Sequence, residues 1–312
     1  MKIIDAILRS EYLAERPPVL FDIGASGEIN AKWKPIASYC ICVAFDADDR
    51  EFHVTEKTNS TYRKLLTFNR IVTAEPIEFA DFYLTASPFC SSLLEPEGDK
   101  LKPWIHSGLF SVVNKKRLPA ITLTESLRQA NINYIDWFKS DSQGTDLRLF
   151  NSLSPSVRSG ILAVEMEPGI LDAYKGEDKL AVVMRQMEEN DFWLSTMEVK
   201  GVQRLDASHV ADLKPYISRR IMRKSPGWAE VTYLRRAARF QAREYLLLIV
   251  FALLEGQYGF ALEIVEAASE FAGVALFRDC RTEILRELKA EKRKVPMIYL
   301  KQKIDKLFSR FT

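Results

Sequence analysis

The sequence predicts an α/β protein in which residues 1–208 form a doubly wound, mostly parallel sheet and residues 209–312 form an all-helical appendage. Two observations predict this division. Through residue 205, short apolar runs that end near an acidic residue alternate with segments of helical pattern. This alternation is typical of a parallel sheet with helices on both faces. Beyond residue 209, apolar residues recur at helical spacing and no run is convincing as a strand.

Continuous apolar runs are the expected strands, because parallel strands are buried on both faces. They lie at residues 19–23, 40–45, 71–74, 79–85, 134–138 and 161–166. Two further runs, 192–197 and 199–205, are separated by Glu198 alone. We interpret them as an antiparallel pair that ends the sheet and makes it mixed.

Helices are expected where apolar residues recur every three or four positions. In the first two-thirds these segments are 1–16, 29–38, 49–66, 124–130, 146–153 and 178–189, and in the tail they are 231–242, 245–255, 258–271 and 275–294. Residues 86–118 carry turn residues and no regular pattern. We expect an irregular segment there, of the kind that often binds ligands in compact domains.

Composition limits the class of protein. A chain of 312 residues suits one large domain and one small one. Its formal net charge of +2 gives no reason to expect nucleic acid as a partner. The N-terminus lacks the apolar core of a signal peptide, and the longest apolar run is about half of the roughly 20 residues that a membrane helix needs. We therefore expect no transmembrane segment and a cytoplasmic protein.

Cysteines and histidines predict no metal site. The four cysteines include no C-x-x-C pair, and the three histidines are scattered along the chain. Cys40 and Cys42 share one face of an expected strand, so they cannot easily bond to each other. We expect reduced, mostly buried thiols.

Three aspartates come at the ends of apolar runs. Asp22 closes the first run, just before a turn that holds Gly24 and Gly27, and Asp46 and Asp141 follow two later runs. Because the carboxyl ends of parallel strands line one edge of a sheet, where ligands bind, we expect these carboxylates there. The glycine turn lets a ligand approach the backbone. Asp46 is placed to accept hydrogen bonds from a ribose diol, and the alternative role for it is a helix cap.

These residues resemble the motifs of a known enzyme family. One segment resembles the first motif of class I S-adenosylmethionine-dependent methyltransferases: Asp22-Ile23-Gly24-Ala25-Ser26-Gly27. Another resembles the K-x-D-x-x-G-x-E signature of FkbM-type methyltransferases: Lys139-Ser140-Asp141-Ser142-Gln143-Gly144-Thr145-Asp146. Similar to the same family are Ser91-Ser92, the strand 161–165 and Tyr174-Lys175-Gly176. The resemblance covers about residues 19–205. It departs at Asp46 and Asp146, where the family usually has glutamate, and at Thr124, where the family usually has an acidic residue.

The resemblance implies S-adenosylmethionine as cofactor and methyl transfer to a hydroxyl oxygen, with a glycan or another secondary metabolite as acceptor. It implies that the cofactor is held by Asp22, Gly24, Ala25, Gly27 and Asp46. Asp141 would lie near the methyl group and act as a base or orient the acceptor. His106, in the irregular segment, is a second candidate base, and a surface histidine without a role is the alternative reading of it.

Two other functions stay open. A nicotinamide-dependent oxidoreductase would need G-x-G-x-x-G after the first strand, but Asp22 stands at the first glycine position. A catalytically silent methyltransferase-like scaffold would use its helical tail to bind a partner. The tail holds a basic stretch from Lys214 to Arg243, which suits an anionic acceptor, a membrane surface or a solvated helix face. Its apolar residues 245–260 suit packing on the sheet or on a second copy in a homodimer.

Overall fold

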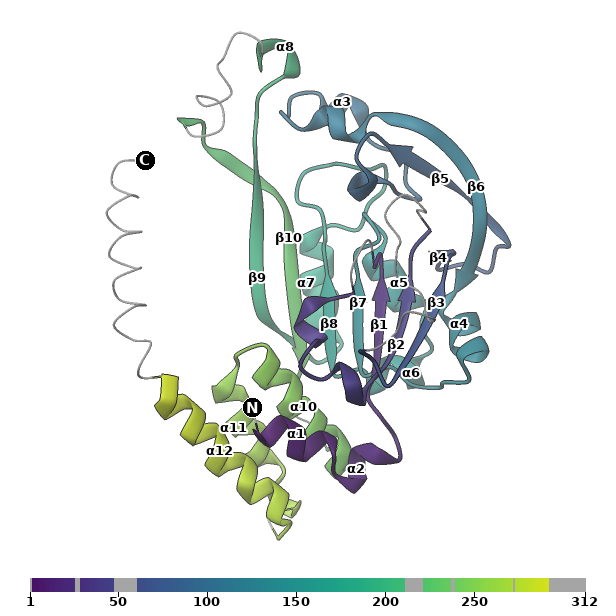
Figure 1. The fold of residues 1–312 in the computed structure, drawn as a ribbon. Helices are drawn as coiled ribbons and strands as arrows, with labels where there is room; N and C mark the ends of the chain where they lie inside the picture. The colour runs from purple at the N-terminus through teal and green to yellow at the C-terminus, as the bar shows by residue number, and fades with distance from the viewer. Residues whose placement is uncertain are drawn as a thin grey trace.

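The computed structural model describes residues 2–25, 29–47, 61–210, 221–236, 239–271 and 273–291. Its main feature is a seven-stranded sheet with the order β3-β2-β1-β7-β8-β10-β9 (Figure 1). The strands are β3 (Lys64–Phe68), β2 (Ile41–Phe45), β1 (Val19–Ile23), β7 (Trp137–Ser140), β8 (Ala163–Met166), β10 (Lys224–Arg235) and β9 (Phe192–Gln203). The first five are parallel, and β10 runs antiparallel to both of its neighbours. A mixed α/β protein with a mostly parallel central sheet is therefore confirmed.

Eleven α-helices lie in the described part of the chain. They are α1 (Lys2–Leu8), α2 (Glu11–Ala14), α3 (Gly98–Leu101), α4 (Leu123–Ala130), α5 (Asp146–Ser152), α6 (Pro155–Gly160), α7 (Leu180–Glu189), α8 (Ala207–Val210), α10 (Ala242–Leu254), α11 (Tyr258–Ala267) and α12 (Ala275–Glu291). None of the described helices is long and apolar enough to cross a membrane. Figure 1 shows α1 and α12 side by side, although they come from opposite ends of the sequence.

Strand β10 corrects the expectation of an all-helical region from residue 209. Strand β10 pairs with β9 along its length, and its last part, from Val231 to Leu234, also pairs with β8. The run Val231-Thr232-Tyr233-Leu234 is buried in the sheet. A short apolar run rich in β-branched and aromatic residues fits a strand as well as a helix, and pairing with two neighbours decides for the strand.

Three other expectations are also wrong. The two runs expected as an antiparallel pair form the single strand β9, whose partner is β10. The end of the helix expected over 49–66 falls in β3, and residues 48–60 lie outside the described part of the chain. The segment expected to be irregular, 86–118, ends in β6 (Val112–Thr122). That strand forms a small second sheet with β4 (Ile71–Thr73) and β5 (Phe79–Thr85).

Two hydrophobic clusters cover the two faces of the main sheet. Leu20 of β1 joins the cluster that contains α1 and α10, and Phe21 joins the cluster that contains α4, α5 and α7. This division follows from the alternation of side chains along a strand. Helix α10 is buried over most of its surface, and Phe251 packs edge-on against Trp137 at 4.8 Å. The C-terminal helices therefore share a core with the sheet.

Candidate functional site

A cavity of about 270 Å³ lies at the carboxyl ends of β1, β2 and β7. Three predicted site residues meet on its wall: Gly24 after β1, Asp46 after β2 and Asp141 after β7. Apolar residues of β4, β5 and the turn at residues 88–93 form one side of the wall, and polar residues complete it: Arg70, Lys139, Ser142 and Gln143. In doubly wound sheets, ligands bind at the carboxyl ends of the strands, where the order of the strands reverses its direction across the sheet.

Glycine at position 24 is required by the geometry of the turn. Its φ is +79°, and a Cβ atom there would lie 2.2 Å from the backbone oxygen of Asp141. The N–H groups of Gly24 and Ala25 both donate to the backbone oxygen of Phe45 at 3.0 Å. The turn therefore holds the ends of three strands together. Ala25 is buried in the core and is not on the cavity wall, whereas Gly27 lies outside the described residues.

Asp22 acts on the cavity through Lys139. Its carboxylate is fully buried and forms an ion pair with the Lys139 ammonium at 2.7 Å, and it also accepts a hydrogen bond from the Asn30 N–H at 3.0 Å. Lys139 lies on the cavity wall. Burial alone would lower the pKa of Lys139, but the carboxylates of Asp22 and Asp141 outweigh it and raise that pKa. Asp22 therefore neutralises a buried cation and anchors the chain after β1.

Asp46 lies on the wall of the same cavity with 8% of its surface exposed. Its backbone N–H donates to the oxygen of Phe68 at the end of β3, at 3.3 Å. This bond ties the end of β2 to its neighbour and orients the residue toward the cavity. The nearby capping candidates Asp48 and Asp49 lie outside the described part of the chain.

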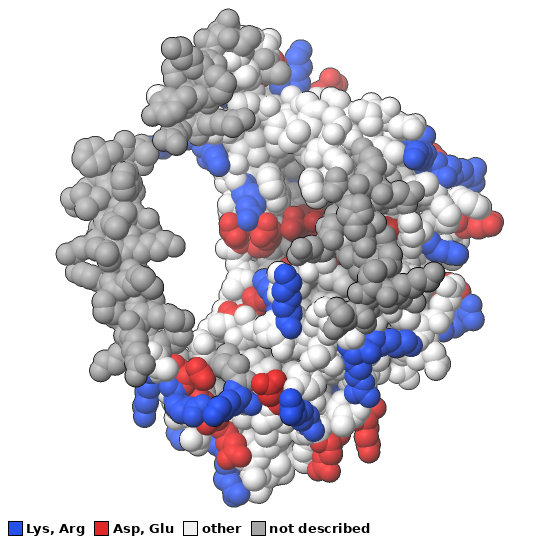
Figure 2. All heavy atoms as spheres, viewed as in Figure 1, with Lys and Arg blue, Asp and Glu red and all other residues white. Residues whose placement is uncertain are grey.

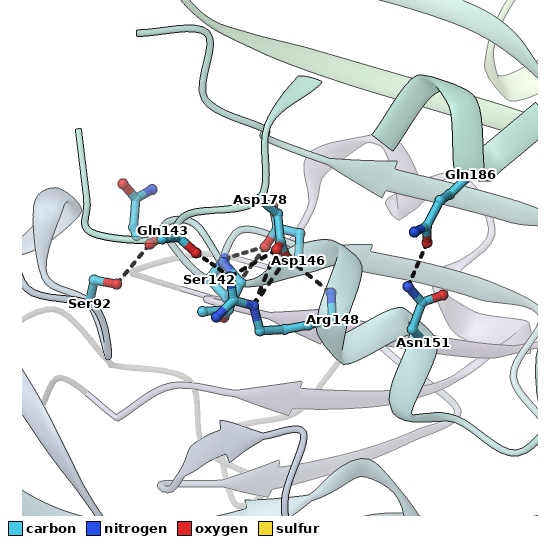
Figure 3. Close-up of polar contacts among 10 residues, drawn as sticks. Ser92, Ser142, Gln143, Asp146, Arg148, Asn151, Asp178 and Gln186 are labelled. Atoms are coloured by element: carbon cyan, nitrogen blue, oxygen red, sulfur yellow. Dashed lines mark hydrogen bonds and ion pairs between the residues drawn. The ribbon is translucent and has the colours of Figure 1, made fainter. Parts of the chain in front are cut away.

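Asp146 anchors the turn between β7 and α5. Its Oδ1 accepts hydrogen bonds from the Ser140 hydroxyl at 2.7 Å and from the N–H and hydroxyl of Ser142 at 2.8 and 2.6 Å (Figure 3). Its Oδ2 accepts from the N–H of Glu167 at 3.0 Å, which ties the turn to the end of β8. The side chain is buried, and it lines neither this cavity nor the second cavity that adjoins it, described below. The last residue of the FkbM-like signature thus has a structural role.

Gln143 and Gly144 are braced from three sides. The Ser92 hydroxyl donates to the backbone oxygen of Gln143 at 2.7 Å (Figure 3), and the Tyr174 hydroxyl donates to its side-chain oxygen at 3.0 Å. Gly144 has a φ of +104°, and a Cβ atom there would lie 3.0 Å from the Cβ of Glu177. Serine, tyrosine and glycine at these motif positions therefore fix the backbone around Asp141.

A second cavity, of about 350 Å³, adjoins the first. The two cavities share Phe89, Asp141 and Gln143. The second one extends from there toward β10 and the turn at Ser107–Phe110. Asp141 therefore faces two spaces at once. Such an arrangement suits a reaction between two bound molecules.

The Asp141 carboxyl has a pKa closer to neutrality than that of an ordinary aspartate. Burial raises its pKa to about 6, although the Lys139 ammonium acts the other way. The amide of Gln143 donates to Oδ1 at 2.5 Å, so the orientation of the carboxyl is fixed. A group with a pKa near neutrality is suited to general base catalysis.

His106 lies on the second cavity, as a candidate base must. Burial lowers the pKa of its imidazole, so the ring is neutral at pH 7. Its ring contacts Phe110 edge-on at 5.2 Å. Its Nδ1 is buried and has no hydrogen-bond partner among the described residues.

Glu167 is the acidic site residue that the sequence-based prediction missed. It directly follows β8 and lies on the second cavity, opposite the turn that carries Asp141. Burial, and then the charges of Asp141 and Glu230, raise the pKa of Glu167 to about 9. Its position just after a buried strand is the same signal that identified Asp141.

Glu165, two residues earlier, has another role. Its carboxylate pairs with the Lys32 ammonium at 3.0 Å and accepts from the Asn30 amide at 3.1 Å. Both partners follow β1, so this group braces β8 against the chain after β1. Among the described residues, no group of three or more histidines, cysteines or acids could hold a metal ion.

Comparison with known proteins does not identify a family for this chain. No protein-family model matches the chain, and no curated protein matches it either. Any statement about its function therefore depends on the residues and on the geometry described above.

Proposed function

We propose that the protein is an S-adenosylmethionine-dependent methyltransferase that transfers a methyl group to a hydroxyl oxygen. One observation carries the proposal: two cavities adjoin at Asp141 at the carboxyl ends of the parallel strands of the main sheet. The first would hold the cofactor and the second the acceptor. The FkbM-like residues support it, because Lys139, Asp141 and Gly144 all line one or both of the two adjoining cavities.

The residues of the first cavity fit this cofactor. Asp46 follows the second strand, where a carboxylate can accept hydrogen bonds from a ribose diol. Ile71, Val72 and Phe82 offer an apolar surface to an adenine ring. Bound there, S-adenosylmethionine would supply a methyl group on a positively charged sulfur. The Asp141 carboxylate on the shared wall suits that positive charge.

The chain's own part in the reaction is to place the acceptor and take its proton. With the cofactor bound, the acceptor hydroxyl oxygen would receive the methyl group that the sulfur gives up, and Asp141 would take the proton of that hydroxyl. The neutral ring of His106 is the second group on the same cavity that can accept that proton. Holding both molecules at the junction supplies proximity, which accounts for much of the rate in such displacements.

A nicotinamide dinucleotide suits this site less well. Its pyrophosphate would need N–H groups at a helix N-terminus just after β1. In the described residues between β1 and β2, the chain forms only short 3-10 turns, Ala31–Trp33 and Ala37–Tyr39. Asp22 is moreover buried in an ion pair where that fold has its first glycine. No contact or cavity among the described residues favours the other alternative, a catalytically silent scaffold that binds a partner through its helical tail.

Isothermal titration with S-adenosylhomocysteine tests the proposal. The wild-type chain should bind it, and Asp46→Ala should weaken binding about tenfold, because charge-assisted hydrogen bonds to the ribose are lost. Asp81→Ala is the control, since that aspartate is exposed on β5 and pairs only with the exposed Lys115 in the described structure. Absence of binding by the wild type, or tighter binding of NADH, would contradict the proposal.

A further inference from the structure

The second cavity has a lining of unusual chemistry. Four aromatic rings form much of its wall, and together we name them the aromatic wall: Phe89, Phe110, Tyr174 and Trp228. Its carboxyl groups come from Asp141, Glu167 and Glu177. Among the described residues that line it there is no lysine or arginine. An anionic acceptor would therefore meet like charge and no cation.

One of the three carboxylates is already engaged. Glu177 pairs with the Lys179 ammonium at 3.0 Å and accepts a hydrogen bond from the Ala173 N–H at 2.8 Å. It also lies close against Gly169, where a Cβ atom would come within 2.5 Å of its Oε2. The cavity therefore offers Asp141 and Glu167 to a ligand.

Glu167 has no charge partner in the described structure. No ion pair or hydrogen bond joins its carboxyl to a described side chain, and only its backbone N–H is bonded, to Asp146. The charged groups that act on it most strongly are Asp141, Glu230, Asp146 and the cation of Lys139, and Glu230 is itself paired with Lys200 at 3.0 Å. Lys139 is engaged by Asp22 at 2.7 Å. On the face seen in Figure 2, acidic side chains gather near the middle of the molecule, with basic side chains directly beside them.

We propose that the second cavity binds a compact apolar amine, whose ammonium group pairs with Glu167 and whose body lies on the aromatic wall. A cation near aromatic faces and a carboxylate gains from both. It would also offset the negative charge that Asp141 adds beside Glu167. The binding inference stands on the cavity alone, and it rests on the proposed function only in assigning the methyl-accepting hydroxyl group to the same amine.

Titration of three phenyl compounds tests the charge preference. The probes are 2-phenylethylamine, 2-phenylethanol and phenylacetate, which are close in size and differ in charge. The amine should bind about tenfold more tightly than the alcohol, and phenylacetate should bind most weakly. Equal or tighter binding of phenylacetate would overturn the inference.

Glu167→Gln tests the partner residue. The variant keeps the shape of the side chain, so the amine should fall to the affinity of the alcohol while the alcohol is unaffected. Glu189→Gln is the matched control, because Glu189 is exposed on α7 and does not line the cavity. Phe89→Ala is a second variant at an exposed ring and should weaken the amine and the alcohol alike. Unchanged amine affinity in Glu167→Gln would overturn the inference.

Proton release gives a readout that packing alone would not move. Glu167 with a pKa of about 9 is protonated at pH 7.5, and it must ionise to pair with an ammonium group. Amine binding should therefore release close to one proton, measured by titration in buffers of different ionisation enthalpy, and none in Glu167→Gln. Affinity should rise toward pH 9 and fall above about pH 10, where the amine loses its charge. Amine binding without proton release would contradict the pairing.

S-adenosylhomocysteine titration separates the two proposals. Binding of S-adenosylhomocysteine without binding of the amine would overturn this inference and leave the methyltransferase proposal in place. Binding of the amine without S-adenosylhomocysteine would overturn the methyltransferase proposal and support the amine site.

Discussion

Two aspartates at opposite ends of β7 differ in how their charge is matched. Asp136, just before the strand, is 2% exposed and accepts from the Val19 N–H at 2.9 Å. Its two oxygens also accept from the two terminal nitrogens of Arg243, both at 2.9 Å. Asp141, just after the strand, lies on two cavities and has Gln143 as its side-chain donor.

The difference shows how this sheet divides stability from chemistry. At the amino end the negative charge is matched by a cation of fixed geometry, so it serves the fold. At the carboxyl end Asp141 and Glu167 are held close together, while Lys139 is bonded to Asp22. Both groups at the carboxyl end have raised pKa values, and groups of this kind concentrate at functional sites.

Arg243→Met should have the largest effect and should act on stability. It leaves Asp136 buried without its cation, which costs about 3–5 kcal/mol of unfolding free energy. Urea unfolding measures the loss. Arg128→Met at the exposed pair with Glu125 should leave the free energy of unfolding nearly unchanged. Adding Asp136→Asn to Arg243→Met should recover most of the loss, and a loss below about 1 kcal/mol in Arg243→Met would break the comparison.

Asp141→Asn should act on the reaction and spare the fold. Losing the base should slow methyl transfer by about 100-fold. Single-turnover transfer of labelled methyl groups measures this rate. The unfolding free energy should not fall, because a buried carboxyl of raised pKa is removed.

Asp146→Asn is the matched variant in the same turn, since that carboxylate is buried and accepts four hydrogen bonds. It should lose about 1–3 kcal/mol of stability. A larger loss of stability in Asp141→Asn than in Asp146→Asn would contradict the division of roles.

Glu167→Gln should have the smallest effect on the free energy of unfolding near pH 5, and the effect should grow with pH. The pKa of Glu167 is raised in the folded protein from 4.5 to about 9. Its contribution to stability is therefore full below pH 4.5, declines as pH rises and is lost above about pH 9, by about 1.4 kcal/mol per pH unit at most. Thermal unfolding at pH 5, 7 and 9 should show the variant gaining stability relative to wild type. A constant difference between the two proteins would contradict the raised pKa.

The strands that the sequence predicts well are those buried on both faces. The runs 19–23 and 41–45 are apolar at every position except Asp22, so they admit few alternatives. Strand β10 was missed because charged residues flank its buried run, Val231–Leu234, and a run this short fits either period. Only its position between β8 and β9 identifies it as a strand.

The candidate site shows the same limit. Gly24, Asp46 and Asp141 were predicted because each follows a strand of the same sheet, and the three do lie on one cavity. Asp22 was predicted as a contact to the cofactor, yet it is buried against Lys139. The two side chains meet because β1 and β7 are neighbours in the sheet and Asp22 is in register with Lys139. The order of residues along the chain does not specify this pairing.

By itself the sequence determined the alternation of strands and helices, the glycine at the first turn and the aspartates at the strand ends. These are local properties of chain geometry and of apolar patterning. Tertiary structure alone decided which charges are matched. Arg243 reaches Asp136 across more than a hundred residues of sequence, whereas Glu167 finds no described cation free to neutralise it. The physical reason is that a pKa and an ion pair depend on distances in space, which chain order does not specify.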